Sequence, residues 1–169
     1  PHLHTDPRKL LQVADALAER LQQEAPAQRA AIEQRRLAFA TQWQARIAQW
    51  ERRAAPLRGR HVAAQHTSFG YLWRWLGIVQ RADLEPKPGM SPTPGHLQRL
   101  LDGLRPAPPM AIVIAGYQDP RPGRWLSGQL APPVPVVVLP ATVGEDAAAD
   151  ALARWFDGLL YGLLQAAAP

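Results

Sequence analysis

The stretch RHVAAQHTSFGYLWRWLGI, residues 60–78, decides the fold. Its pattern predicts a short apolar strand over residues 61–65, a polar turn that carries His66, and an aromatic helix over residues 69–76 that ends at Gly77. In an open α/β sheet, a residue just past the carboxyl end of a strand lies in the ligand crevice. His66 is therefore placed where binding chemistry is expected, and its neutral imidazole can offer a nitrogen to a metal ion.

Short apolar runs alternate with helical stretches from there to the end of the chain. Continuous apolar runs predict strands that are buried on both faces. The expected strands cover residues 61–65, 78–84, 110–115 and 134–139, and the expected helices cover residues 69–76, 93–104, 123–130 and about 147–166. Four βα units in a row predict an α/β fold with a small four-stranded parallel sheet, doubly wound and flanked by helices. The loops at His66, Glu85, Tyr117 and Pro140 then share one rim of this sheet.

The chain upstream of residue 56 has a helical pattern. Asp6 and Pro7 are suited to be the N-cap and the first residue of a helix that fades before Pro26. A second helical pattern over residues 27–55 contains no proline or glycine, and at ~1.5 Å per residue it forms a rod of about 40 Å. Its thin apolar stripe fits a partly solvated surface helix, half of a coiled coil, or a spine helix that runs along two lobes.

Composition limits the classes of function. The 169 residues suffice for one domain or one lobe of a larger protein, and the start at Pro1 without an initiator Met predicts a processed or cut chain. Lys plus Arg exceed Asp plus Glu by 19 to 14, but the arginines are scattered along the helical region, so nucleic acid is not an expected partner. The absence of cysteine excludes disulfides and thiolate metal sites. No apolar run approaches the ~20 residues of a membrane span, and no signal peptide is visible.

Three motifs, in order, resemble a known family. They are PHLHTDP at residues 1–7, HTSFGYL at residues 66–72 and LEPKPG at residues 84–89, with the long helix between the first two. This order resembles the periplasmic zinc and manganese solute-binding proteins of ABC importers, the ZnuA/TroA type or cluster A-I. The resemblance covers essentially the whole chain.

The resemblance implies that the chain is a C-terminal lobe with its spine helix, and that an N-terminal lobe is absent. Residues 1–26 would be a ligand loop and first helix, residues 27–56 the spine helix, and residues 57–169 the C-terminal α/β lobe. In the family one metal ion lies between the lobes. Its ligands are a His from the N-terminal lobe, the His of the PH segment, the His after the first strand of this lobe, and a carboxylate after the last strand. Carried over to this sequence, the ligands are His2 and His66.

The resemblance also implies a transport role rather than an enzymatic one: metal capture in the periplasm and delivery to an ABC permease in the inner membrane. Imidazole ligands suit Zn²⁺, whereas the glutamate found at the His66 position in manganese importers favours a harder ion. Zn²⁺ is therefore the expected metal, with Mn²⁺ as the alternative. His4 is an additional candidate ligand, although the geometry of a helix start turns it away from His2. His61 and His96, on a strand and a helix, are expected to be structural.

The chain departs from the family after its last strand, where Leu139 runs directly into Pro140 and no carboxylate follows the strand immediately. Asp146 is suited to cap the closing helix instead. The sequence thus predicts three His ligands and an open or water-filled fourth position, which Glu145, Tyr117 or Asp119 could approach.

Two other classes of function remain as alternatives. One is a helical interaction or adaptor module whose long helix docks a partner while the sheet acts as a scaffold. The other is a metal-dependent hydrolase, which needs an open coordination position and a general base. Ser68 lies close to His66 in the sequence, but there is no nucleophile elbow and no acid is expected to orient the imidazole, which disfavours hydrolase catalysis.

Overall fold

The expected sheet is confirmed. The structure, a computed structural model, describes residues 2–144 and 148–168. Its four parallel strands have the order β2-β1-β3-β4. The strands are β1 (His61–Ala64), β2 (Val79–Asp83), β3 (Ala111–Ala115) and β4 (Val136–Leu139). The chain winds outward from β1 to β2, then crosses to β3 and β4, which places the topological switch point at the carboxyl ends of β1 and β3.

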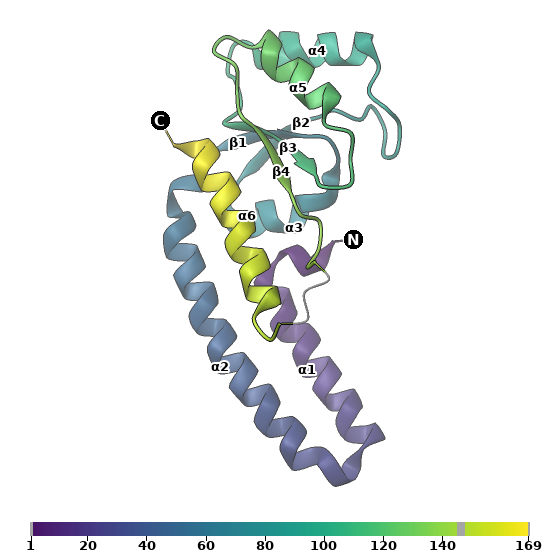
Figure 1. Ribbon diagram of the computed structural model, residues 1–169, viewed down its shortest axis with the longest axis vertical. Coiled ribbons are helices and arrows are strands. Elements are labelled where there is room, and N and C mark those ends of the chain that lie inside the picture. Colours follow the sequence, from purple (N-terminus) through teal and green to yellow (C-terminus); the bar gives the residue numbers. More distant parts are fainter. Residues whose placement is uncertain (1, 145–147, 169) are drawn as a thin grey trace.

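Helices cover both faces of the sheet (Figure 1). One face is covered by α4 (Pro94–Leu104) and α5 (Arg121–Gln129), whose leucines pack on Ala63, Ile112 and Ile114. The other face is covered by α3 (Gly70–Leu76) and α6 (Ala151–Ala167). All five residues of β3 are buried, as expected for a central strand between two helical layers.

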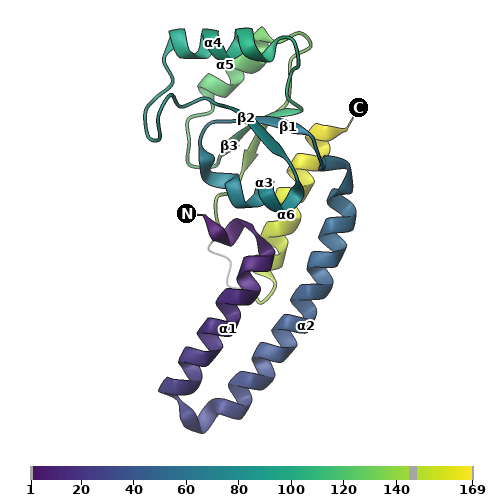
Figure 2. The same ribbon diagram turned by 180° about the vertical axis from the view of Figure 1, so that it is seen from behind.

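The first two helices form a hairpin that projects away from the sheet (Figures 1 and 2). They are α1 (Pro7–Glu24) and α2 (Arg29–Ala54), joined by a short 3-10 turn. As predicted, the Asp6 side chain caps α1 by accepting the backbone N–H of Arg8 at 3.0 Å. The hairpin is fixed at its sheet end by Trp43, whose indole N–H donates to the backbone carbonyl of Pro7 at 2.8 Å.

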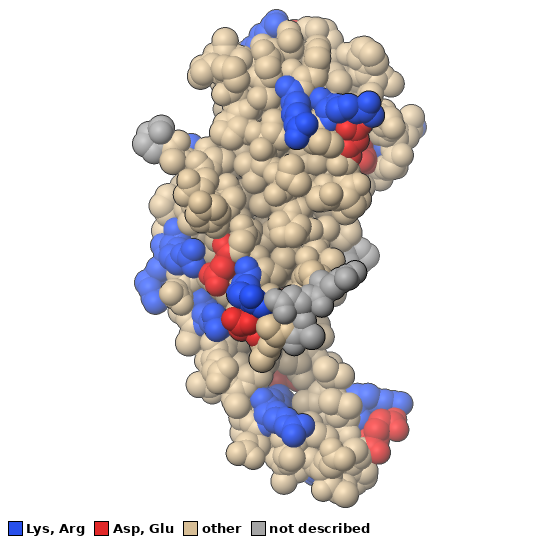
Figure 3. All heavy atoms as spheres, in the orientation of Figure 1, with Lys and Arg blue, Asp and Glu red and all other residues tan. Residues whose placement is uncertain are grey.

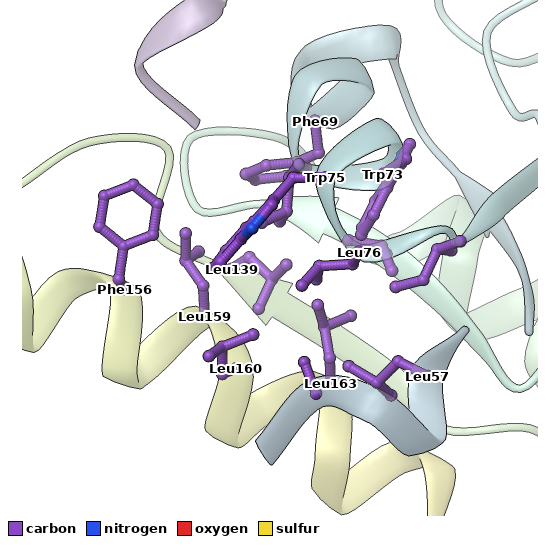
Figure 4. Close-up of a cluster of buried hydrophobic side chains, with 14 of the residues drawn as sticks. Leu57, Phe69, Trp73, Trp75, Leu76, Leu139, Phe156, Leu159, Leu160 and Leu163 are labelled. Atoms are coloured by element: carbon purple, nitrogen blue, oxygen red, sulfur yellow. The ribbon is translucent and has the colours of Figure 1, made fainter. Parts of the chain in front are cut away.

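An aromatic and aliphatic cluster joins α3, α6 and the end of α2. Figure 4 shows side chains of α3 and α6 pointing toward one another above the sheet, among them Trp75, Phe156 and Leu159. The tryptophan N–H groups have acceptors: Trp50 donates to Asp157 at 2.9 Å, and Trp75 donates to Glu51 at 3.0 Å. These bonds allow large indoles to be buried without an orphaned donor. The sheet and the end of the hairpin therefore share one core.

Two expectations about the last part of the chain are wrong. The closing helix begins at Ala151 rather than near residue 147, and Asp150 holds the N-cap position. Asp146 therefore does not precede this helix directly, and it lies outside the described residues. The run at residues 134–139 was expected to be fully buried, but β4 is an edge strand and Val138 is 52% exposed. Continuous apolar composition did not distinguish an edge strand, covered by α6 on one side, from a central one.

Charged side chains on the face drawn in Figure 3 occur as small mixed groups of both signs, not as a single basic patch. Ion pairs between such side chains include Arg53 with Asp157 at 2.8 Å. Among the residues that the structure describes, no helix is long and apolar enough to cross a membrane.

Candidate metal centre

His66 lies at the switch point because β1 ends just before it. Sheet pairing continues one residue past Ala64, where the backbone N–H of Gln65 donates to the Val113 carbonyl at 2.9 Å. His66 then keeps an extended backbone, and the buried Phe69 anchors the following turn to the core. The His66 side chain is 23% exposed, so its ring is held by protein but remains accessible.

Glu85 contacts the His66 ring, a contact that no local sequence pattern reports. The Nδ1 atom of His66 lies 2.8 Å from Oε2 of Glu85, and the Glu85 side chain is only 13% exposed. The expectation that no acid orients this imidazole is therefore wrong. The contact follows from the register of the sheet. Ala64 of β1 pairs with Asp83 of β2, so His66 and Glu85, each two residues further on, come side by side.

His2 lies next to the same rim. The 3-10 turn over Leu3–Thr5 packs against α3, and the buried Thr5 hydroxyl donates to the His2 carbonyl at 2.9 Å. Burial lowers the pKa of His2, and the nearby His4 and His66 rings lower it further when they are charged. The lowered pKa favours the neutral imidazole, which is the form that binds metal.

His4 is engaged with the end of the sheet. Its Nε2 atom lies 3.0 Å from the carbonyl oxygen of Ala141, and its ring stacks on Trp155 with 5.7 Å between centroids. The rings of His2 and His4 lie 6.0 Å apart in an edge-on arrangement. The contacts with Ala141 and Trp155 attach the N-terminal segment to the loop after β4 and to α6.

The other candidate ligands have different surroundings. Tyr117 is 67% exposed, and its hydroxyl lies 3.1 Å from the Ser68 hydroxyl. Asp119 accepts the backbone N–H of Arg121 and forms an ion pair with its guanidinium at 2.7 Å; these hydrogen bonds from Arg121 lower the pKa of Asp119. Glu145 lies outside the described residues. Tyr117 and Asp119 thus already have protein partners.

His96 lies on α4, away from His2, and its Nε2 atom lies 3.0 Å from the Asp83 carbonyl oxygen at the end of β2. Within residues 2–144 and 148–168, no three His, Asp or Glu side chains converge closely enough to hold a metal ion. The rim therefore offers two imidazoles, His2 and His66, which is half of a tetrahedral ligand set.

The fold has counterparts among solved structures, and the sequence matches a family model. No curated protein matches the sequence. The solved structures that resemble it include one described as ZnuA, with a TM-score of 0.83, 19% identity, and coverage of 99% of this chain and 60% of that chain. Another is FpvC from Pseudomonas aeruginosa in complex with Mn²⁺, with a TM-score of 0.75, 22% identity, and coverage of 98% and 64%. A third is a mutant of the laminin-binding adhesin Lmb from Streptococcus agalactiae, with a TM-score of 0.82, 19% identity, and coverage of 99% and 63%.

At 19–22% identity, these TM-scores show a shared fold alone. The chain spans about three fifths of the length of these solved structures. A family model described as "Zinc-uptake complex component A periplasmic" (ZnuA) matches residues 1–163, nearly the whole chain. The chain therefore belongs to the ZnuA family.

Proposed function

We propose that this chain is the metal-binding C-terminal lobe, with its spine helix, of a solute-binding protein that captures Zn²⁺ in the periplasm and delivers it to an ABC permease. The observation that carries this proposal is the placement of His2 and His66, which are far apart in sequence, at one rim of the sheet. Family membership supports the transport role.

The choice of Zn²⁺ rests on the donors. Imidazole nitrogen binds Zn²⁺ at about 2.0–2.1 Å and is less suited to Mn²⁺, which prefers oxygen ligands. The related FpvC structures contain Mn²⁺ or Ni²⁺, so Mn²⁺ is the alternative to test. The proposal keeps the fourth position open or water-filled, because Pro140 follows β4 directly and offers no side-chain donor. In a carrier, such a position would ease metal release.

An apolar groove supports the proposal of a second, N-terminal lobe. It lies between α1 and α2, has a volume of about 380 Å³, and is lined by Leu17 and Leu21, whose side chains are 55% and 44% exposed. Contiguous exposed apolar surface marks interaction sites in soluble proteins. In this proposal part of the N-terminal lobe covers the groove. The chain itself is then divided into a ligand loop and first helix (residues 1–26), the spine helix (residues 27–56) and the C-terminal α/β lobe (residues 57–169).

The same groove also suits the adaptor alternative, in which a partner docks on the helices and no metal is carried. Hydrolase catalysis has less support, because the Ser68 hydroxyl is hydrogen-bonded to Tyr117 rather than presented to His66. Metal binding separates transport from the adaptor function.

The test is calorimetric titration of the two-lobed protein with Zn²⁺ and Mn²⁺. We expect His66→Ala to weaken Zn²⁺ binding by more than about 100-fold, since loss of a ligand should exceed the 10–100-fold effect of losing an outer-shell partner. His96→Ala is the matched control, because this ring bonds the Asp83 carbonyl and should leave affinity nearly unchanged. Equal effects of the two substitutions would refute the site, and tighter binding of Mn²⁺ than of Zn²⁺ would overturn the choice of metal.

A further inference from the structure

The contact between His66 and Glu85 is built into the sheet. The backbone N–H of Leu84 donates to the Ala64 carbonyl at 2.9 Å, and that of Glu85 donates to the Gln65 carbonyl at 3.1 Å. Pairing of β1 with β2 thus continues past the ends of both strands. It fixes the backbone positions from which the His66 and Glu85 side chains meet.

The carboxylate of Glu85 is itself held in place. Its Oε2 atom accepts the backbone N–H of Gly89 at 2.8 Å, in addition to its contact with His66. Gly89 has φ +80°, a left-handed conformation that glycine adopts without strain, and Pro86 and Pro88 stiffen the loop between. Glu85 is therefore a pre-oriented acceptor rather than a mobile surface carboxylate.

An ionised carboxylate can only accept hydrogen bonds, so its contact with Nδ1 requires the imidazole hydrogen to be on Nδ1. In a neutral ring, the lone pair available to a metal is then on Nε2. A carboxylate that holds a ligating histidine in this way fixes its tautomer and raises its basicity, and losing it typically costs 10–100-fold in metal affinity.

We propose that Glu85 is the positioning residue of the metal site: it keeps the hydrogen of His66 on Nδ1 and presents Nε2 to the metal. The inference rests on the proposed function, because it assigns His66 as a ligand. Glu85, which follows β2, would thus act on the metal through His66 rather than by binding it. No carboxylate directly follows β4 on the same rim.

The first test needs no metal. Long-range ¹H–¹⁵N spectra of the metal-free 169-residue chain, recorded where His66 is neutral, report which ring nitrogen carries the hydrogen. We expect the Nδ1–H form in the parent chain and a shift toward the Nε2–H form in Glu85→Ala. Glu85→Gln, which is nearly isosteric, should retain part of the Nδ1–H form through its amide oxygen. An unchanged tautomer in both variants would overturn the inference.

The second test measures Zn²⁺ affinity in the two-lobed protein. Glu85→Ala should weaken binding about 10–100-fold, and Glu85→Gln should weaken it less. The matched control is Glu51→Gln, because Glu51 also accepts a ring N–H, that of Trp75, but lies on α2 away from the rim. This control should change neither the tautomer nor the affinity. Melting temperatures show whether each variant is folded. If Glu85→Ala is unfolded, the affinity of Glu85→Gln is compared with that of the parent protein instead.

The outcomes separate this inference from the proposed function. Loss of Zn²⁺ binding in His66→Ala with full binding in both Glu85 variants would overturn the role of Glu85 and leave the proposed function standing. Equal loss in Glu85→Gln and His66→Ala, with the His66 tautomer unchanged, would make Glu85 a direct ligand and also overturn the inference. Absence of Zn²⁺ binding in the parent protein would reject the proposed function itself, even if the tautomer responds to Glu85.

Discussion

The imidazole of His4 is stacked on the indole of Trp155, with ring centroids 5.7 Å apart and an interplanar angle of 16°. The indole N–H of Trp155 in turn donates to the Pro140 carbonyl at 3.0 Å. The segment that carries His2 is thereby attached to α6 and to the loop after β4. His4 can thus serve the site as an anchor without touching the metal.

The first prediction separates an anchoring His4 from a ligating one. His4→Phe keeps an aromatic ring on Trp155 but has no donor atom, so we expect its Zn²⁺ affinity in calorimetry to stay close to that of the parent two-lobed protein. His4→Ala removes the stacking, frees the His2 segment and should weaken binding by about tenfold, as for loss of an outer-shell partner. A loss in His4→Phe as large as that in His66→Ala would identify His4 as a ligand.

The second prediction concerns metal removal. The buried clusters on both faces of the sheet consist mainly of strand and helix residues, so the chain should fold without metal. We expect chelation with EDTA to leave the melting temperature of the 169-residue chain nearly unchanged. A collapse of the fold in EDTA would instead show that a metal is structural here.

The third prediction concerns the end of α3, the helix that connects His66 to the core. Gly77 has φ +69° at the C-cap, so Gly77→Ala should lower the free energy of unfolding by about 1–2 kcal/mol. Gly70→Ala is the matched control in the same helix: its φ is −58°, and apart from its chain neighbours and the backbone of its own helix no heavy atom lies within 4 Å of the added methyl group. This substitution should stabilise by about 0.5–1 kcal/mol. Denaturant unfolding measures the free energy of unfolding of both variants. Destabilisation of similar size in the two would contradict the requirement for glycine at the left-handed position 77.

The fourth prediction is a pH dependence in the helical hairpin. Hydrogen bonds from Arg36 lower the pKa of Glu33 below its ordinary value of 4.5. Because the folded-state pKa is below the unfolded one, the contribution of Glu33 to stability is present above 4.5 and is lost as the pH falls through the folded-state value. The difference in melting temperature between the parent and Glu33→Gln should therefore shrink on acidification. A difference that is constant with pH would contradict the prediction.

Local patterns in the sequence predicted most of the fold. The Asp6 cap, the stop at Gly77 and the strand–turn–helix around His66 depend on neighbouring residues, and the structure has them. The burial of each strand depends on its order in the sheet, so the exposure of Val138 could not be read from an apolar run. The start of α6 was placed too early because an acidic residue before an alanine run is a weak helix-start signal.

The position of His66 in the candidate site could be predicted from the sequence, but its contacts could not. His66 could be placed because its position after a strand depends on sequence alone, whereas its contact with Glu85 depends on the register between β1 and β2. The contact of His4 with Ala141 joins residues at opposite ends of the chain, and no local pattern reports it. The roles of His2 and His66 as ligands stay predictions until metal binding is measured.

The position of β4 at the edge of the sheet has a consequence for aggregation. An unpaired strand edge exposes backbone N–H and C=O groups to which another chain can add. Pro135 and Pro140 bracket β4, and because proline has no backbone N–H, they limit the edge that a foreign strand could use to the four residues between them. The opposite edge, β2, carries Arg81 and Asp83, whose charges oppose burial in a second sheet. The two edges are thus protected against self-association by different means.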